Sequence, residues 1–470
     1  MLAAWLPLLL VSGCNGDAGG KGPGAGPDMV LISIDTLRAD RLALYGAPTD
    51  ADGGPGQAFT PRALGEIGRV FEQCWAPSGK TVPSLASFWT GRTPLEHGAI
   101  SNFHVVQAPT HAERLRARGW RTHAAVANRA LAQPLGLERG FETFSLFAKE
   151  REGELGAALA ARAGPAIESH ERQLLWAHFM SPHQPYAPPP ELAARYAPGP
   201  GPAGDNDTLF EMHRDPDAVS AQDVQHLRGL YDAEVRLASD RVAALLADLD
   251  ARYRSAGRGG LFANAVVVFF ADHGEELGDR HGYFLHAKSL YSGVTRVPLV
   301  IAGPGVEPGR ERTPLDLQQV FGLVADAAGV PRKQLAAAET QPQYRVATWK
   351  DRFFALRDAR WTLVHNPCLD LQGPAEPPVD AAYAYPAVAL YDRSRDPLER
   401  MDVSRQNPRE TRRMLAALQD WRAGLAVAEA RYVGAGDSEA GTSLEELAYS
   451  GSSGPGDPPC PPWPASRWQP

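Results

Sequence analysis

This sequence has few cysteines and no dominant sign of charge. It also lacks an apolar run long enough to cross a membrane. Only four of its 470 residues are cysteines, Cys14, Cys74, Cys368 and Cys460. They are too few for a disulfide framework, and none has the spacing of a zinc ligand. The formal net charge of −8 argues against a nucleic-acid partner, because contact with phosphate backbones needs a basic surface.

The N-terminal apolar stretch, residues 1–11, falls short of the ~20 residues that span a bilayer. Ser12, Gly13 and Cys14 follow it, as in an export signal with a bacterial lipobox, whose cysteine carries the lipid. A buried N-terminal strand is the alternative, and no Lys or Arg precedes the run. We expect a signal at 1–14, a flexible tether at 15–27 and a membrane attachment through the lipid. The expected location is the bacterial cell envelope, facing the periplasm or the exterior.

Hydrophobic residues make up 44% of the chain, enough for a large core. Short apolar runs alternate with amphipathic stretches, which predicts an α/β fold with buried strands flanked by helices. The expected strands are residues 29–34, 123–127, 174–179, 265–270 and 297–302, and the expected helices are 109–118, 154–163 and 221–251. These elements place a main domain at 28–340.

The pattern changes near residue 343. Strand-like segments at 349–356, 361–365 and 389–391, followed by a helix at 408–427, predict a small C-terminal α+β subdomain with an antiparallel sheet at 341–430. Residues 431–470 are rich in Gly, Ser, Pro and acidic residues, which is typical of a low-complexity tail.

Acidic residues and a histidine follow two of the expected strands. Asp35 comes directly after the first strand, and Asp272 and His273 come after the run that ends at Phe270. Ligands collect at the carboxyl ends of parallel strands, and carboxylates with an imidazole suit Zn or Mn and, less well, Ca. Taken alone, Asp35 fits a helix N-cap better than a ligand role. Gly274 would let a ligand or a backbone segment approach closely.

Together these features resemble the sulfatase family of the alkaline-phosphatase superfamily. The family pattern covers residues 28–427 and includes, in order, Asp35, the signature-like run 81–91, residues 94–98, 140–142, 181–186, the Asp-His-Gly-Glu run 272–275, 290–298 and 390–399. The resemblance implies an alkaline-phosphatase-like sandwich, with a large, mostly parallel sheet flanked by helices and a small C-terminal subdomain. It also implies one divalent metal ion and a sulfate- or phosphate-ester substrate.

The signature departs from the family at its first position. Sulfatases have there a Cys or Ser that is oxidised to formylglycine, whereas this chain has Thr81, which cannot give that aldehyde; Leu85 replaces the signature arginine. A formylglycine hydrate expels sulfate with its second hydroxyl, but threonine has only one. The transferred group on Thr81 would therefore be released by direct attack of water or an acceptor, as in relatives with metal-activated threonines.

The resemblance assigns a role to each candidate residue. Asp35, Asp272 and His273 would bind the metal, with Thr81 as fourth ligand and nucleophile. His183 would contact the transferred group or protonate the leaving oxygen, and His286 and Lys288 would contact the leaving group. Lys80 and Asn102 are weaker candidates for substrate oxygens. His97 suits a structural hydrogen bond better than a ligand role. His281 would be a second metal ligand as in alkaline phosphatase, but the sequence shows no full second set of carboxylates.

Three functions remain open from the sequence. The first is a metal-dependent sulfatase-family hydrolase that cleaves a sulfuric or phosphoric ester through Thr81. The second is a phosphoethanolamine-type phosphoryl transferase, which a membrane attachment would suit. The third is a catalytically silent binding lipoprotein, although burying Asp35, Asp272 and His273 would bring a mere scaffold no gain.

Overall fold

A computed structural model describes residues 26–54, 56–131, 134–215, 218–279, 284–286, 289–332, 335, 343–366 and 387–431. The predicted signal at 1–14, nearly all of the tether at 15–27 and the tail from 432 onward lie outside these residues. So do Cys14, Cys368 and Cys460, whereas Cys74 is a buried free thiol.

An eight-stranded sheet forms the centre of the molecule. Its order is β10 (Gly309–Glu311), β2 (Arg69–Phe71), β9 (Leu299–Ala302), β7 (Ala265–Ala271), β1 (Asp28–Ile34), β6 (Gln173–Phe179), β4 (Arg121–Val126) and β5 (Thr143–Leu146). All neighbours pair in parallel except β9, which is antiparallel to β7 and β2. The predicted mostly parallel sheet is thus confirmed, and the apolar runs are strands buried on both faces.

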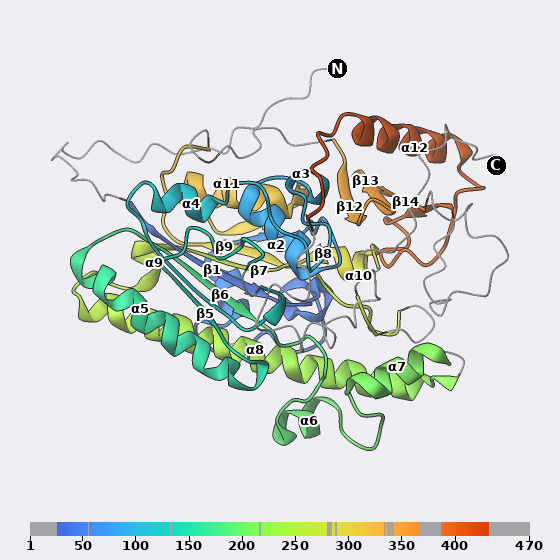
Figure 1. The fold of residues 1–470 in the computed structure, drawn as a ribbon. Coiled ribbons are helices and arrows are strands. Elements are labelled where there is room, and N and C mark those ends of the chain that lie inside the picture. The colour runs from blue at the N-terminus through green and yellow to red at the C-terminus, as the bar shows by residue number, and fades with distance from the viewer. Residues whose placement is uncertain are drawn as a thin grey trace.

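Helices cover both faces of this sheet (Figure 1). One face carries α5 (Leu155–Ser169) and α8 (Ala221–Ser255), and the other carries α2 (Thr81–Thr90), α4 (His111–Arg116) and α11 (Leu317–Ala327). Phe88 of α2 stacks on Phe270 of β7, with ring centroids 4.5 Å apart, and so packs this helix against the sheet. Shorter helices are α1 (Pro61–Ile67), α3 (Pro94–His97), α6 (Pro190–Tyr196), α7 (Asn206–Arg214), α9 (Leu261–Asn264) and α10 (Ser292–Thr295), with 3-10 turns η1 (Ala39–Arg41), η2 (Ala43–Tyr45), η3 (Arg129–Leu131) and η4 (Lys149–Glu154).

A small sheet links the main body to the C-terminal subdomain. It has the order β11 (Leu315–Asp316), β3 (Cys74–Trp75) and β8 (Arg296–Val297). The single strand predicted at 297–302 is therefore two strands, β8 and β9. Pro298 separates them because it has no N–H to donate to a ladder.

The C-terminal subdomain is an antiparallel four-stranded sheet with one helix, as predicted. Its strands are β12 (Arg345–Trp349), β13 (Phe353–Arg357), β14 (Trp361–His365) and β15 (Val388–Asp392), and α12 (Pro408–Ala423) packs on it. The predicted continuous segment at 349–356 was wrong. A turn at Lys350, with φ of 53°, reverses the chain between β12 and β13.

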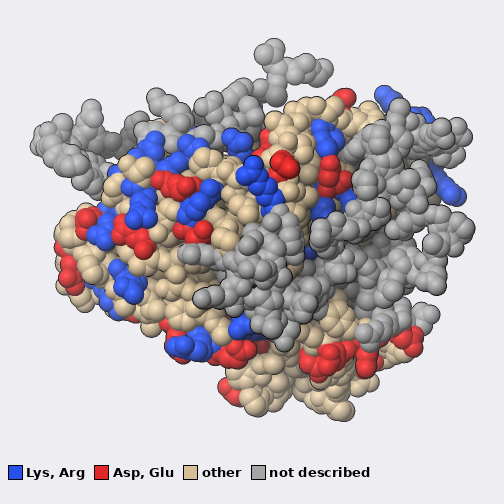
Figure 2. Space-filling model, in the orientation of Figure 1, with Lys and Arg blue, Asp and Glu red and all other residues tan. Residues whose placement is uncertain are grey.

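The surface in Figure 2 mixes basic and acidic side chains, and neither sign dominates the visible, described part of this face. Such a surface has no broad basic footprint of the kind that binds nucleic acid. Within the described part of the chain, none of the helices combines the length and the apolar character that crossing a membrane requires.

Candidate active site

Four neighbouring parallel strands bring polar side chains to one edge of the sheet. Asp35 follows β1, Asn128 follows β4 by one residue beyond Ala127, and Asp272 follows β7. His178 is the penultimate residue of β6, which lies between β1 and β4. The rule that sites form at the carboxyl ends of parallel strands therefore holds in this fold.

Asp35, Asp272 and His273 converge on one point. Each offers a ligand atom within 4.8 Å of the other two, and all three side chains are buried. Asp35 Oδ1, Asp272 Oδ2 and His273 Nε2 have no hydrogen-bond partner. Buried polar atoms are normally paired, so three unpaired acceptors around one point fit a divalent cation.

The ring of His273 is oriented for such a role. Its Nδ1 lies 2.9 Å from the carbonyl oxygen of Gly274, and a carbonyl only accepts, so Nδ1 carries the proton. Nε2 then presents its lone pair, 3.6 Å from Asp35 Oδ1 and 3.5 Å from Asp272 Oδ2. A hydrogen bond on the far nitrogen is the usual arrangement of a metal-binding histidine.

The pKa values of the two carboxyl groups are shifted in opposite directions. Burial alone would raise the pKa of Asp35, but the hydrogen bond from His178 and the nearby His183 and His273 lower it below its ordinary value. Burial, and then the charge of Asp35, raise the pKa of Asp272 well above its ordinary value. Two buried carboxylates this close to each other are both stable in their charged forms only when a positive charge is added beside them.

Thr81 stands beside this cluster as the first residue of α2. Its Oγ1 lies 3.4 Å from Asp35 Oδ2, and its side chain is buried. Asn128 Nδ2 donates to Asp35 Oδ2 over 2.5 Å and approaches Thr81 Oγ1 to 3.4 Å. The amide thus bridges the carboxylate and the hydroxyl, and the backbone N–H groups of the first turn of α2 favour negative charge at this position.

His286 lies beside His273, and His183 lies beside His286. The ring centroid of His286 is 4.6 Å from that of His273 and 5.1 Å from that of His183. His286 Nδ1 lies 2.9 Å from Glu275 Oε1. His183 Nδ1 donates to the Gln184 carbonyl oxygen over 2.7 Å, which leaves Nε2 as an acceptor. Burial, more than any neighbour, lowers the pKa of His183 to about 3.

The loop that carries His183 is held by charged side chains that are partly or fully buried. Lys149 Nζ donates to the carbonyl oxygens of His183 and of Pro185. Ser181 N donates to Glu152 Oε2 over 3.2 Å, and Arg241 Nη1 lies 3.2 Å from the same oxygen. None of these supporting residues carries a local sequence signal, because their partners lie tens of residues away.

The remaining predicted residues take different places. Lys80 is buried next to Thr81, with Nζ 3.4 Å from Ser101 Oγ. Asn102 accepts from Val82 N over 3.1 Å and so caps the start of α2, holding Thr81 in place. His97 bonds to Ser87 Oγ and accepts from Ala99 N, in a structural arrangement. Lys288 and His281 lie outside the described residues.

Two residues of the candidate site, Asn128 and His178, were not predicted from the sequence. Asn128 follows an expected strand, so the strand-end rule applied to Asp35 would have found it. His178 lies within an expected strand, where an inward histidine is usually part of the core. It links Ser33 to the site, since Nδ1 is 2.8 Å from Ser33 Oγ and Nε2 is 3.4 Å from Asp35 Oδ2.

The backbone around the cluster is tightly constrained. Thr36, directly after Asp35, has φ of 54°, a conformation that a β-branched residue adopts only under strain and that is common at functional sites. A Cβ on Gly274 would lie 2.2 Å from the carbonyl oxygen of Gly293. The close approach expected at Gly274 is therefore made by the backbone of a neighbouring segment.

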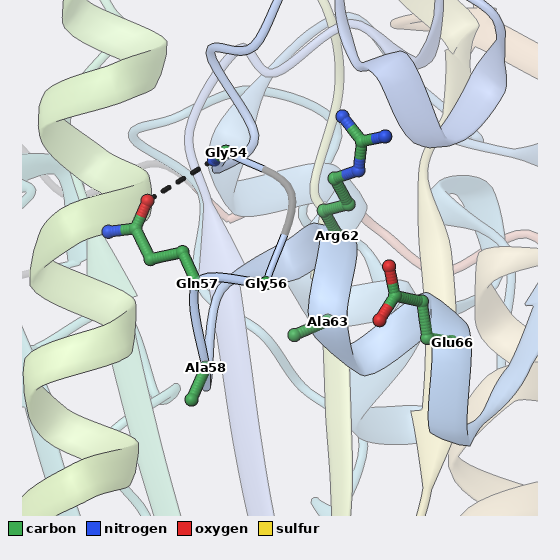
Figure 3. A pocket seen from close by; sticks show the side chains of 7 residues that line it. All are labelled: Gly54, Gly56, Gln57, Ala58, Arg62, Ala63 and Glu66. Carbon is green, nitrogen blue, oxygen red and sulfur yellow. Dashed lines mark hydrogen bonds between the residues drawn. The ribbon is translucent and has the colours of Figure 1, made fainter.

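A surface cavity of about 100 Å³ lies elsewhere, in the loop before α1 and the helix itself (Figure 3). Its lining residues are Gly54, Gly56, Gln57, Ala58, Arg62, Ala63 and Glu66. Gln57 points to the backbone of Gly54, whose N–H donates to Gln57 Oε1 over 3.2 Å. None of these seven residues belongs to the buried cluster.

Comparison with known proteins agrees with this geometry. The sequence pattern that defines the Sulfatase family matches residues 27–330. The chain belongs to the sulfatase family. Members of this family generally use a divalent metal, and the three unpaired acceptors of Asp35, Asp272 and His273 lie within the matched region.

Individual relatives of this sulfatase-family chain are distant. Choline-sulfatase of Rhizobium meliloti is 26% identical over 224 residues, which are 44% of this chain and 38% of the relative. The chain thus matches less than two fifths of the length of that protein. A 2-O GAG sulfatase has a structure with a TM-score of 0.61 at 17% identity, covering 86% of this chain and 95% of the other. Phosphonate monoester hydrolase of Agrobacterium radiobacter gives 0.60 at 17% identity, covering 84% and 95%. These two likenesses concern the fold.

Proposed function

We propose that this chain hydrolyses a sulfuric or phosphoric ester, with Thr81 as the nucleophile and one divalent cation held by Asp35, Thr81, Asp272 and His273. The observation that carries the proposal is the 3.4 Å separation of Thr81 Oγ1 from Asp35 Oδ2, beside three buried acceptors without partners. The donor set favours Zn or Mn and also suits Ca. Such a cation, when bound, would lower the pKa of a hydroxyl and neutralise the oxygens of the ester group.

Three side chains have separate roles in the proposed cleavage of the ester. Asn128 and Asp35 fix the orientation of the Thr81 hydroxyl, because Oγ1 donates to Asp35 Oδ2 and accepts from Asn128 Nδ2. Thr81 Oγ1 gives its proton to Asp35 Oδ2 and forms a bond to sulfur or phosphorus while the bond to the ester oxygen breaks, and the same proton returns to Thr81 when the second step frees it. Water then attacks the group held on Thr81, and the threonine hydroxyl is restored.

The leaving oxygen needs a proton, and two histidines stand near it. His183 is neutral because burial lowers its pKa to about 3. An anionic ester next to Nε2 would raise that pKa, since a nearby negative charge favours the imidazolium. His183 can then give the proton to the departing alcohol, and His286 provides a second imidazole on the same side.

A catalytically silent binding protein accounts less well for the site. Leaving Asp35 Oδ1, Asp272 Oδ2 and His273 Nε2 buried without partners costs about 1–3 kcal/mol for each group. A scaffold that only bound a ligand elsewhere would gain nothing from this arrangement. Transfer to an acceptor other than water shares the first step with hydrolysis and differs only in what attacks the sulfur or phosphorus of the group held on Thr81.

Paired assays on purified protein test the proposal. Wild type and Thr81→Ala are compared on an aryl sulfate, an aryl phosphate and an aryl phosphodiester, with metal content measured in both. We expect metal in both proteins and turnover of at least one ester by the wild type alone. Equal turnover by Thr81→Ala would remove Thr81 from the mechanism, and metal-loaded wild type without turnover of any ester would support the binding protein instead.

A further inference from the structure

The segment that follows His286 is held at both of its ends. Ser289 N donates to the carbonyl oxygen of His286 over 2.7 Å, and Ser289 Oγ donates to Glu276 Oε1 over 2.6 Å. Gly274 belongs to residues 272–275, the proposed metal-binding loop, and its N–H donates to the carbonyl oxygen of Val294 over 2.6 Å. The position of His286 therefore depends on where residues 289–294 lie.

Glu399, in the C-terminal subdomain, anchors this segment from behind. Its side chain is completely buried, and Oε2 accepts from Ser292 N over 2.7 Å. Oε1 accepts from Thr362 Oγ1 over 2.5 Å. Glu399 has φ of 57°, a conformation uncommon outside glycine and maintained only where the surroundings fix it.

Arg357 completes the anchor. Its guanidinium is 1% exposed, donates through Nη2 to the carbonyl oxygen of Leu290, and has Nε 3.5 Å from Glu399 Oε1. It also lies over the ring of Trp75, 4.6 Å from the centroid. Burial alone would raise the pKa of Glu399, but Arg357 and Arg393 lower it, so the carboxylate is charged. Two backbone groups of residues 290–292 are thus held by one buried ion pair.

We propose that Glu399 and Arg357 are positioning residues for His286, and that the C-terminal subdomain completes the active site by holding residues 290–292 against the metal-binding loop. The role in turnover depends on the ester hydrolysis proposed above. The anchoring itself does not, because it is a property of the folded chain and can be measured without substrate. The ion pair is deeply buried, and removing one partner of such a pair is costly, so its effect should extend along the segment.

Hydrogen exchange measures the anchoring directly. In Glu399→Ala the Ser292 amide loses its acceptor, and we expect exchange of a peptide covering residues 289–295 to accelerate by about tenfold or more. Glu399→Gln keeps an acceptor oxygen and should restore most of the protection. Thr362→Val removes only the hydroxyl that donates to Glu399 Oε1, keeps its volume and serves if Glu399→Ala does not fold.

Asp351→Asn is the matched control. It breaks the ion pair of Asp351 with Arg422, whose Nε lies 2.8 Å from Oδ1, within the same subdomain, and neither of these two described side chains hydrogen-bonds to residues 289–295. The control should leave exchange of the 289–295 peptide unchanged. If Glu399→Ala and Thr362→Val also leave it unchanged, or if Asp351→Asn accelerates it equally, the anchoring is refuted.

A double-mutant cycle connects the anchor with turnover. We expect Glu399→Ala to lower kcat/KM on the order of 10²-fold in wild type, because small misplacements of a catalytic group are that costly. In a His286→Ala background the same change should have little further effect. Equal losses in both backgrounds would contradict positioning through His286. Absence of turnover by the wild type would count against the proposed hydrolysis, and the exchange result would still decide the anchoring.

Discussion

Thr81 Oγ1 lies 3.4 Å from Asp35 Oδ2, although 46 residues separate the two in the chain. They meet because β1 ends where α2 begins, at the carboxyl edge of a parallel sheet. Asn128, which follows β4, bonds to the same carboxylate oxygen. A hydroxyl placed between a charged carboxylate and an amide donor has its lone pair and proton oriented before any substrate arrives.

Substitutions at Thr81 separate the hydroxyl from the shape of the side chain. Thr81→Val keeps the volume and removes the hydroxyl, and we expect kcat to fall by ~10³-fold or more, because the covalent step is lost. Thr81→Ser keeps the hydroxyl and should remain within ~10-fold of wild type. Steady-state assays on the best ester substrate check both. Comparable rates for the Val and Ser variants would contradict a nucleophilic role.

Asn128→Ala should affect catalysis more than folding. The amide supports Asp35 and Thr81 from behind, and loss of such a supporting group typically costs ~10–100-fold in activity or metal affinity. We expect a lower kcat with nearly unchanged KM. Asn128→Asp would add a third carboxylate beside Asp35 and should be more harmful than alanine. Kinetics of both variants at saturating metal provide the measurement, and an alanine variant as active as wild type would exclude the bridge from the mechanism.

His183→Ala should change the dependence of the rate on the leaving group. If His183 protonates the leaving oxygen, its loss costs ~10²–10⁴-fold for alkyl esters, whose alcohols leave poorly without a proton. Nitrophenyl esters, which leave as stable anions, should lose much less. The plot of log kcat/KM against leaving-group pKa should therefore steepen in the variant. A parallel downward shift for all esters would assign His183 to binding instead of proton transfer.

The sequence predicted those parts of the site whose signals are local. Asp35, Asp272 and His273 directly follow apolar runs that could only be buried strands, and each was placed at the correct edge. Asn128 follows such a run as well, but a single asparagine after a strand is as typical of a turn. The helix that starts at Thr81 was not predicted, because its first turn contains β-branched Val82 and Pro83, which have low helix propensity.

Long-range support had no signal in the sequence. Lys149 and Glu152 hold the His183 loop across more than two dozen residues, and Glu399 reaches Ser292 across 107 residues. Such pairs are set by tertiary packing, which periodicity does not encode. The turn at Lys350 was missed for a different reason, since its positive φ occurs at a residue that rarely adopts it.

A buried carboxyl outside the site should make stability depend on pH. Burial raises the pKa of Asp316 to about 7, despite nearby Arg345 and Arg357. Between the unfolded value of 3.8 and about 7 the folded state keeps a proton that the unfolded state has lost. The free energy of unfolding should therefore fall as pH rises through this window, and level off above it, by an upper bound on the order of 4 kcal/mol.

Asp316→Asn tests this assignment and keeps the cap of α11, where the backbone N–H of residue 316 donates to Gln319 Oε1 over 3.0 Å. Asparagine is neutral at all pH values and caps helices as well as aspartate. Thermal unfolding midpoints of both proteins are compared at about pH 5 and about pH 8. We expect the midpoint of the variant to exceed that of wild type by more at the higher pH than at the lower pH. A variant less stable at both would show that Asp316 is charged and favourable in the fold.

The central claim is that Asp35, Thr81, Asp272 and His273 share one divalent cation. Elemental analysis of the full chain, purified without chelator and dialysed against Zn or Mn, measures it most directly. We expect about one ion per chain for wild type and for the Asp351→Asn control, and a loss of most bound metal in Asp272→Ala and His273→Ala variants that retain their circular dichroism. Wild type without a stoichiometric ion, or Asp272→Ala that retains a full ion, would contradict it.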